Sequence, residues 1–279
     1  MTVSEWLRNA REALASTGCP DPEIDARWIA EDKLNMSRTE LKFEGDRALN
    51  PEALAGLNAA LERRMHGEPV QYILESADFM GLKFHVDKRV LIPRQDTESL
   101  VEAAIAALIS MKEPKVLDMC TGSGCIGLSI GSLVPHARIT LSDISKDALD
   151  VARTNAKTLG VDAVLRHGDL FAAVGKDRFD LIASNPPYIP RGDLSGLQRE
   201  VQHEPMLALD GGADGLDLYR RIAQGAKDHL NPGGYIYLEV GIDEARDVLD
   251  LLKENIDCAD AGVIKDLCGV ERVVWARSK

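Results

Sequence analysis

Residues 116–127 read VLDMCTGSGCIG, an apolar run that leads through a glycine-rich turn into residues suited to a helix. The apolar run predicts a buried strand that ends near Met119. Gly122 and Gly124 allow a ligand to approach the backbone closely, and a helix beginning near Cys125 presents free N–H groups at its start. The stretch therefore predicts a strand, turn and helix of an α/β domain, with a binding site at the turn.

The same alternation continues on the C-terminal side of this stretch. Five strands are predicted, at Val116–Met119, Arg138–Asp143, Ala163–Arg166, Phe179–Ser184 and Tyr235–Val240. The helices between them are predicted to begin near Cys125, Ser145, Leu216 and Asp243. Two further strand patterns, Gly262–Asp266 and Arg272–Ala276, are separated by a short turn. We therefore expect an α/β fold with a mostly parallel, Rossmann-like sheet of seven strands and an antiparallel hairpin at one edge.

The N-terminal part of the chain predicts a small helical bundle. Apolar residues recur there at helical spacing, and both Asp21-Pro22 and Asn50-Pro51 resemble an N-cap followed by proline at the first helical position. Gly18 and Gly67 are suited to the residue after a helix end. No pattern of catalytic residues occurs here, so we interpret the bundle as a recognition or scaffold module.

A hairpin is predicted between the two parts. Apolar and polar residues alternate over Leu82–Val86, Asp87–Arg89 suits a turn, and Val90 and Ile92 resume the alternation. The predicted organisation has three parts: a helical N-terminal substrate-recognition domain at residues 1–76, a β-hairpin linker at 77–95 and the α/β domain at 96–279.

Composition limits the kinds of function that remain. The net charge of −12 over 279 residues argues against a general affinity for nucleic acid, whose phosphates favour Lys and Arg. The five cysteines show no paired metal-ligand spacing, so we expect free thiols in a reducing compartment and no metal. No leader-like or membrane-length apolar segment occurs, so we expect a cytoplasmic protein without membrane contact.

The glycine-rich turn leaves two kinds of ligand open. Gly122, Gly124 and Gly127 satisfy the dinucleotide-binding pattern, which is a weak signal by itself. Asp118 beside the turn favours S-adenosylmethionine, because a carboxylate repels a pyrophosphate but attracts the amino group of a methionine moiety. Asp143, at the end of the next predicted strand, is placed to accept both hydroxyls of a ribose.

Two further loops are expected at the same edge of the sheet. After the third strand, Asp169 is placed to accept the exocyclic amine of an adenine, and Leu170 to cover its ring. The fourth strand delivers Asn185-Pro186-Pro187-Tyr188. Neither proline has an N–H, so the backbone there offers carbonyl acceptors, to which Asn185 adds a side-chain carbonyl and Tyr188 a flat face. Such a pocket suits a planar group that carries an NH2.

Together these motifs resemble a known family. An Asn-Pro-Pro-Tyr motif after a glycine-rich methyl-donor motif is shared by enzymes that methylate planar NH2 groups, and the chain is similar over nearly its whole length to HemK-type peptide-chain release factor glutamine methyltransferases. The matching motifs include Gly67-Glu68-Pro69, Leu91-Ile92-Pro93-Arg94, Glu204-Pro205 and Pro232-Gly233-Gly234. Three positions depart from the family pattern: Glu75 and Cys120 where glycine is usual, and Gln95 where proline is usual.

The resemblance implies a class I methyltransferase that moves the methyl group of S-adenosylmethionine to the N5 nitrogen of a glutamine. That glutamine belongs to the Gly-Gly-Gln motif of class I release factors, and S-adenosylhomocysteine is the other product. The expected catalytic residues are Asn185, Pro186 and Tyr188, with Pro187 also binding substrate. The expected cofactor-binding residues are Cys120, Thr121, Gly122, Ser123, Gly124, Asp143, Asp169, Leu170 and Asn185.

Other functions remain open at this stage. An adenine-N6 methyltransferase acting on nucleic acid would use the same acceptors, although the acidity and the lack of a basic stripe weigh against it. A glutamine on a ribosomal protein is another possible target, and a dinucleotide-binding module on the same fold is a third alternative. We expect a monomer that does not bind nucleic acid directly.

Overall fold

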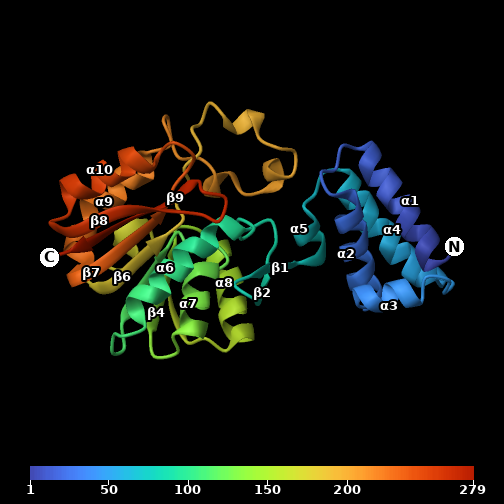
Figure 1. Ribbon diagram of the computed structural model, residues 1–279, viewed down its shortest axis with the longest axis horizontal. Helices are drawn as coiled ribbons and strands as arrows, with labels where there is room; N and C mark the ends of the chain where they lie inside the picture. The colour runs from blue at the N-terminus through green and yellow to red at the C-terminus, as the bar shows by residue number, and fades with distance from the viewer. The chain divides into compact units, whose positions relative to one another are not determined.

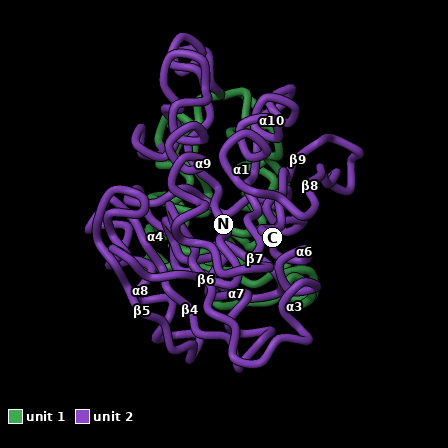
Figure 2. Tube along the Cα trace, turned by 90° about the vertical axis from the view of Figure 1, so that its left-hand side faces the viewer, with its two compact units in different colours: residues 1–76, 198–203 green, residues 77–197, 204–279 purple.

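The structure is a computed structural model that describes residues 1–279. It divides into two compact units, shown in different colours in Figure 2. One unit comprises Met1–Ser76 together with Gln198–His203, and the other comprises Ala77–Leu197 together with Glu204–Lys279. One short segment of the loop that follows the Asn-Pro-Pro-Tyr motif, Gln198–His203, therefore belongs to the helical unit although the residues on both sides of it belong to the larger unit.

The first unit is helical (Figure 1). Its helices are α1 (Val3–Ser16), α2 (Pro22–Leu34), α3 (Arg38–Phe43), α4 (Pro51–Met65) and α5 (Val70–Leu74). Asn50 caps α4 as predicted, since its side chain accepts from the N–H of Ala53 at 2.8 Å. Asp21 stands at the N-cap of α2 but makes no side-chain capping bond, so only proline at the first turn fixes that start.

The buried Arg64 side chain ties residues 198–203 to these helices through an ion pair. Arg64 on α4 donates to Asp25 on α2 at 2.6 Å and to Glu200 at 2.8 Å. Arg64 and Asp25 are both buried, so loss of the guanidinium would leave a carboxylate without its partner. Arg199 lies against Gly67, where an added Cβ would come within 2.6 Å of the Arg199 side chain. The segment is thus anchored at two neighbouring points.

The linker contains a hairpin, but its turn is not where the sequence pattern placed it. Strands β1 (Ser76–Phe79) and β2 (Leu82–His85) pair through a turn at Met80 and Gly81, which both have positive φ, at 51° and 72°. The prediction of a turn at 87–89 with a second strand at 90–92 was wrong. The Ile92 N–H donates to the Glu204 carboxylate at 3.0 Å instead of to a strand, so its apolar pattern reflects burial alone.

The second unit is the predicted α/β domain. Its sheet has the order β5-β4-β3-β6-β7-β9-β8. The strands are β3 (Lys115–Met119), β4 (Arg138–Asp143), β5 (Ala163–His167), β6 (Phe179–Ser184), β7 (Leu230–Glu239), β8 (Cys258–Lys265) and β9 (Glu271–Ser278). The first five are parallel, whereas β9 runs antiparallel to both β7 and β8. The seven strands and the antiparallel edge hairpin are therefore confirmed.

Helices cover both faces of this sheet (Figure 1). One layer is formed by α6 (Glu98–Leu108), α7 (Cys125–Leu133) and α8 (Lys146–Leu159), and the other by α9 (Asp217–His229) and α10 (Ala245–Asn255). The core between the sheet and the second layer includes Tyr219, Ile222 and Leu252, all fully buried. Strand order reverses between β3 and β6, and ligands bind parallel sheets at the carboxyl ends beside such a reversal.

Two of the departures from the family pattern lie at backbone positions that favour glycine. Glu75, directly after α5, has a φ of 52°, and Cys120, directly after β3, has a φ of 58°. A side chain with a Cβ is strained in this left-handed region by roughly 1–2 kcal/mol, whereas glycine is not. The structure therefore explains why glycine suits both positions, and it shows that this chain tolerates the strain.

Replacing Glu75 by glycine should stabilise the helical unit. We expect Glu75→Gly to raise the free energy of unfolding by about 1 kcal/mol, because it relieves the left-handed strain at the end of α5. Urea unfolding measures the change. Glu75→Ala is the matched control, since it removes the same side chain but keeps the Cβ. Equal stabilisation by both variants would show that strain is not the cause.

Candidate active site

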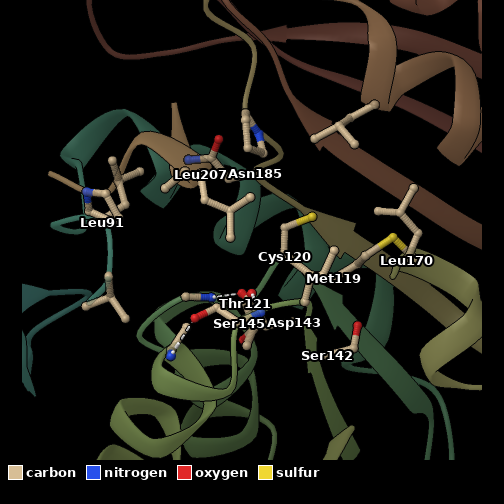
Figure 3. A pocket seen from close by; sticks show the side chains of 18 of the residues that line it. Leu91, Met119, Cys120, Thr121, Ser142, Asp143, Ser145, Leu170, Asn185 and Leu207 are labelled. Carbon is tan, nitrogen blue, oxygen red and sulfur yellow. Dashed lines mark hydrogen bonds between the residues drawn. The ribbon is translucent and has the colours of Figure 1, made fainter. Parts of the chain in front are cut away.

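A cavity of about 630 Å³ lies at the carboxyl ends of β3, β4, β5 and β6 (Figure 3). At the end of each of these strands, or in the loop that follows it, at least one side chain lines the cavity. These residues include Cys120 after β3, Asp143 at the end of β4, Leu170 after β5 and Asn185 after β6. Leu207, in the loop between β6 and α9, lies across the cavity from Asp143 in Figure 3. The four loops expected to converge thus surround one cavity within the α/β unit.

The turn after β3 contains left-handed backbone conformations that glycine adopts without strain. Gly122 and Gly124 have φ values of 53° and 84°, and Gly124 is the N-cap of α7. A Cβ on Gly127 would lie 2.4 Å from Leu141 and 2.9 Å from the Cβ of Asp118, so glycine lets α7 approach the sheet closely. The start of α7 therefore reaches the edge of the cavity with its unpaired N–H groups.

Asp118 is fully buried beneath this turn. Its Oδ2 accepts from the Thr121 hydroxyl at 2.5 Å and from the Gly127 N–H at 2.9 Å, whereas its Oδ1 has no hydrogen-bond partner. Burial raises the pKa of Asp118 to about 7, and the nearby charge of Asp143 adds to the rise. Asp118 does not line the cavity, so the structure places this carboxylate behind the turn and does not show the contact to a ligand amino group that the sequence predicted.

Asp143 is held rigidly at the end of β4. Its Oδ2 accepts from the Gly122 N–H at 2.9 Å and its Oδ1 from the Ser145 N–H at 2.8 Å. Burial raises the pKa of this carboxyl, and the two backbone N–H groups oppose the rise by stabilising the charged form. Each oxygen keeps further acceptor capacity, so the carboxylate can bind a pair of neighbouring hydroxyls in the cavity.

Asp169 and Leu170 occupy the loop after β5. The Leu170 side chain lines the cavity from a strained backbone, with a φ of 48°. Asp169 also lines the cavity, but its Oδ2 is paired with Arg221 of α9 at 2.7 Å. Both partners of this ion pair are about half exposed, so it contributes little stability and can exchange for a ligand. Sequence reasoning did not identify Arg221.

The Asn-Pro-Pro-Tyr motif begins directly after β6. The Asn185 Nδ2 donates to the Thr97 hydroxyl at 3.4 Å, so the amide carbonyl Oδ1 is the end left for a ligand. Asn185 and Pro187 line the cavity, whereas Pro186 and Tyr188 do not. Burial raises the pKa of the Tyr188 phenol to about 12, so the phenol is neutral at physiological pH.

The backbone after Asn185 is fixed by a tight glycine turn. An added Cβ at Gly211 or at Gly215 would lie 2.7 Å or 2.5 Å from the backbone of Tyr188. Ile189 donates to the Leu209 carbonyl at 3.0 Å and accepts from the Gly211 N–H at 2.9 Å. The segment that carries the motif is therefore held against the loop before α9, which limits its freedom to move.

The loop side of the cavity is closed by an ion pair that the sequence left undecided. Arg94 pairs with Glu204, whose side chain is almost fully buried and also accepts from Ile92. The sequence identified both residues only as parts of family motifs, Leu91-Ile92-Pro93-Arg94 and Glu204-Pro205. In the structure Arg94 lines the cavity and Glu204 holds it in place.

Glu239 was not predicted as a site residue. It ends β7 with 1% of its surface exposed, and its Oε2 has no hydrogen-bond partner. Burial raises its pKa to about 7, while hydrogen bonding by Thr97 and Asn185 and the charge of Arg272 oppose the rise. The signal in the sequence was an acid at the end of an apolar run, YIYLEV.

This carboxyl should make the stability of the protein depend on pH. The folded-state pKa of about 7 exceeds the ordinary value of 4.5, so the native state binds more protons than the unfolded state between those pH values. The neutral, protonated carboxyl is compatible with burial, so its full contribution to stability is present below pH 4.5. This contribution is lost progressively as the pH rises to 7 and the buried group ionises. We expect Glu239→Gln to gain stability relative to the unmodified protein as the pH rises, by at most about 3 kcal/mol.

Urea unfolding at pH 5 and pH 8 measures this difference. Ser129→Ala serves as the control, because it removes another buried and unpartnered polar group, on α7, that does not titrate. Its stability difference from the unmodified protein should be the same at both pH values. A Glu239→Gln difference that is equally constant would contradict the assigned titration.

The sheet order, the glycine-rich turn after β3 and the acid ending β4 define a class I S-adenosylmethionine-dependent methyltransferase. A methyltransferase structure from Pyrococcus furiosus superposes with a TM-score of 0.53 at 16% identity, covering 79% of this chain and 98% of that one. The Thermus thermophilus 16S rRNA N2 G1207 methyltransferase, in complex with AdoMet and guanosine, has a TM-score of 0.54 at 20% identity, covering 73% and 50%. At these identities the likeness shows the fold alone.

The family is shown by closer relatives. Residues 5–74 match the PrmC N-terminal domain, and residues 96–200 match the methyltransferase small domain. Release factor glutamine methyltransferases of Geobacter sulfurreducens and Clostridium acetobutylicum are 42% and 44% identical, each over 99% of this chain and over 96% and 98% of the relative. The chain belongs to the release factor glutamine methyltransferase family, as its motifs indicated.

None of the helices is both long enough and apolar enough to cross a membrane.

Proposed function

We propose that this enzyme transfers the methyl group of S-adenosylmethionine to the N5 nitrogen of the glutamine in the Gly-Gly-Gln motif of class I release factors. The observation that carries the proposal is the orientation of Asn185. Its Nδ2 faces Thr97, so its carbonyl oxygen is left for the cavity that Asp143 and the glycine-rich turn also line. The NH2 group of a primary amide can donate a hydrogen bond to this carbonyl oxygen.

The motif acts by orienting a poor nucleophile. The amide nitrogen of glutamine is weakly nucleophilic because its lone pair is delocalised into the carbonyl. Asn185 Oδ1 and the Pro186 carbonyl each accept one amide hydrogen, which fixes the plane of the group and stabilises positive charge that develops on the nitrogen. Tyr188 does not line the cavity and packs against the core of the domain, so it supports the motif from behind; its phenol is neutral and does not act as a base. S-adenosylmethionine supplies the methyl group from its sulfonium and becomes S-adenosylhomocysteine, and the amide nitrogen loses one of its two protons to water after the transfer.

The remaining predicted residues hold the donor. Asp143 binds its ribose hydroxyls, while the turn Cys120–Gly124 approaches it through backbone and is held from behind by Asp118, which accepts from Thr121 and Gly127. Leu170 covers the adenine, and Asp169 accepts its amine after giving up Arg221. S-adenosylhomocysteine occupies the same contacts after transfer, until it leaves the cavity.

The three-part division is part of the proposal. Residues 1–76 recognise the release factor, residues 77–95 link the domains, and residues 96–279 carry the chemistry. The assignment of Gln198–His203 to the helical unit supports this, because that segment follows the Asn-Pro-Pro-Tyr motif in the chain. We further propose that the enzyme is a cytoplasmic monomer, and the net charge of −12 disfavours direct binding to nucleic acid.

Methylation of a release factor is the direct test. The enzyme is incubated with labelled S-adenosylmethionine and a class I release factor, and the methyl group is located by mass spectrometry. We expect it on the Gly-Gly-Gln glutamine, and a release factor with asparagine in that position should remain unlabelled. Parallel incubations with duplex DNA, RNA and ribosomal proteins test the alternative targets. Labelling of one of these in place of the release factor would contradict the proposal.

Variants of Asn185 and Asp143 should affect different steps. Asn185→Ala should lower kcat by about 100-fold or more, because it removes an acceptor for the reacting amide, while the Kd of the donor stays within several-fold. Asp143→Ala should instead raise the donor Kd by about 10- to 100-fold, through lost hydrogen bonds to a charged acceptor. Calorimetry gives the Kd and single-turnover methylation gives the rate. An active Asn185→Ala enzyme would refute the assignment.

A further inference from the structure

Glu239 stands next to Asn185 because of strand register. Strands β6 and β7 are parallel, with Ser184 opposite Leu238, so the next residues, Asn185 just after β6 and Glu239 at the end of β7, stand at the same level. Opposite residues of neighbouring strands direct their side chains to the same face of a sheet. The hydroxyl of Tyr219 donates to the Glu239 carbonyl at 2.7 Å, which fixes the end of β7.

No cation pairs with the Glu239 carboxylate. The nearby Arg272 is engaged elsewhere, since its Nη2 lies 3.1 Å from Asp96 and its Nη1 donates to the Val240 carbonyl at 3.3 Å. A buried carboxyl without a counter-ion reduces the stability of a fold and is not needed for packing. Its presence at the end of β7 therefore calls for a role in the chemistry of the site.

Thr97 and Asn185 lie close enough to this carboxyl for their side chains to lower its pKa. The Asn185 Nδ2 itself donates to the Thr97 hydroxyl at 3.4 Å. An asparagine amide has a donor end and an acceptor end of almost equal shape, so its orientation depends on what surrounds it. The Thr97 hydroxyl can donate or accept and does not by itself select an orientation. An ionised carboxylate only accepts, so it selects the orientation in which Nδ2 points inward.

We infer that Glu239 is a positioning residue for methyl transfer, whose carboxylate holds Asn185 with its carbonyl oxygen toward the substrate amide. The inference rests on the proposed function and adds a residue to it. With Glu239 ionised, Asn185 presents an acceptor to the glutamine NH2. With Glu239 protonated, the carboxyl can donate to Asn185 Oδ1, and the amide then presents its own NH2 to the substrate.

The charged and titratable groups around Glu239 come from several elements: Asp96 from the turn before α6, Arg272 from β9, Tyr188 from the motif, Tyr219 from α9 and Cys125 from α7. Burial keeps both phenols and the Cys125 thiol neutral near pH 7. Asp96 and Arg272 pair with each other, with Arg272 Nη2 3.1 Å from the Asp96 carboxylate. Glu239 is thus the group beside Asn185 whose charge changes near neutral pH.

The kinetic test compares Glu239→Ala and Glu239→Gln in methylation of a class I release factor at saturating donor. We expect Glu239→Ala to lower kcat at least 30-fold with the donor Kd within twofold, and Glu239→Gln to recover part of the rate because its amide oxygen still accepts. The fall of kcat below pH 7 should be absent in Glu239→Gln. Ser129→Ala, which removes a buried hydroxyl elsewhere in the domain, should leave kcat unchanged.

Unchanged kcat in both Glu239 variants would overturn the inference. If Glu239→Ala does not fold, the isosteric Glu239→Gln variant decides through its pH profile, and a retained acid limb would count against the positioning role. Failure of the unmodified enzyme to methylate the release factor would instead overturn the proposed function.

A second measurement needs no substrate. NMR detects the side-chain NH2 hydrogens of Asn185, and their signals are assigned by their absence in Asn185→Asp. In the unmodified protein these hydrogens should exchange slowly with water. In Glu239→Ala they should exchange at least tenfold faster, because the carboxylate that holds this NH2 inward is gone and only the long bond to Thr97 is left. Equal exchange rates in the two proteins would overturn the inference whichever substrate the enzyme uses.

Discussion

The parallel pairing of β6 with β3 on one side and with β7 on the other is the constraint on which the site depends. Its register sets Met119, Ser184 and Leu238 at one level of the sheet, and the Ser184 hydroxyl donates to the Met119 carbonyl at 2.6 Å. Three separate segments therefore leave the sheet together. The donor turn, the Asn-Pro-Pro-Tyr motif and Glu239 become neighbours although they are far apart in the chain.

The site gathers acidic groups that the fold keeps from water. Burial raises the pKa values of both Asp118 and Glu239 to about 7, and neither carboxylate belongs to an ion pair. Such groups reduce stability at neutral pH, and the apolar core between the sheet and the α9–α10 layer offsets this cost. Buried acids without partners mark the places where the fold serves binding and chemistry.

Much of the α/β domain followed from local patterns. The strands Arg138–Asp143 and Phe179–Ser184 have the predicted bounds, because a buried parallel strand requires a short apolar run ended by turn residues. The hairpin was misplaced, since the alternation at Val90 and Ile92 reports burial on one side and does not identify a pairing partner. The turn at Met80-Gly81 gave only a weak signal, because methionine rarely adopts positive φ.

By itself the sequence determined the class of fold, the glycine-rich turn and the acceptor motif, because each depends on residues adjacent in the chain. Only the tertiary structure decided which end of the Asn185 amide faces the cavity, and that Glu204 holds Arg94. It also revealed Glu239 beside Asn185, 54 residues further along the chain (239 − 185). These contacts join distant segments, so they depend on strand register and burial, which no local pattern specifies.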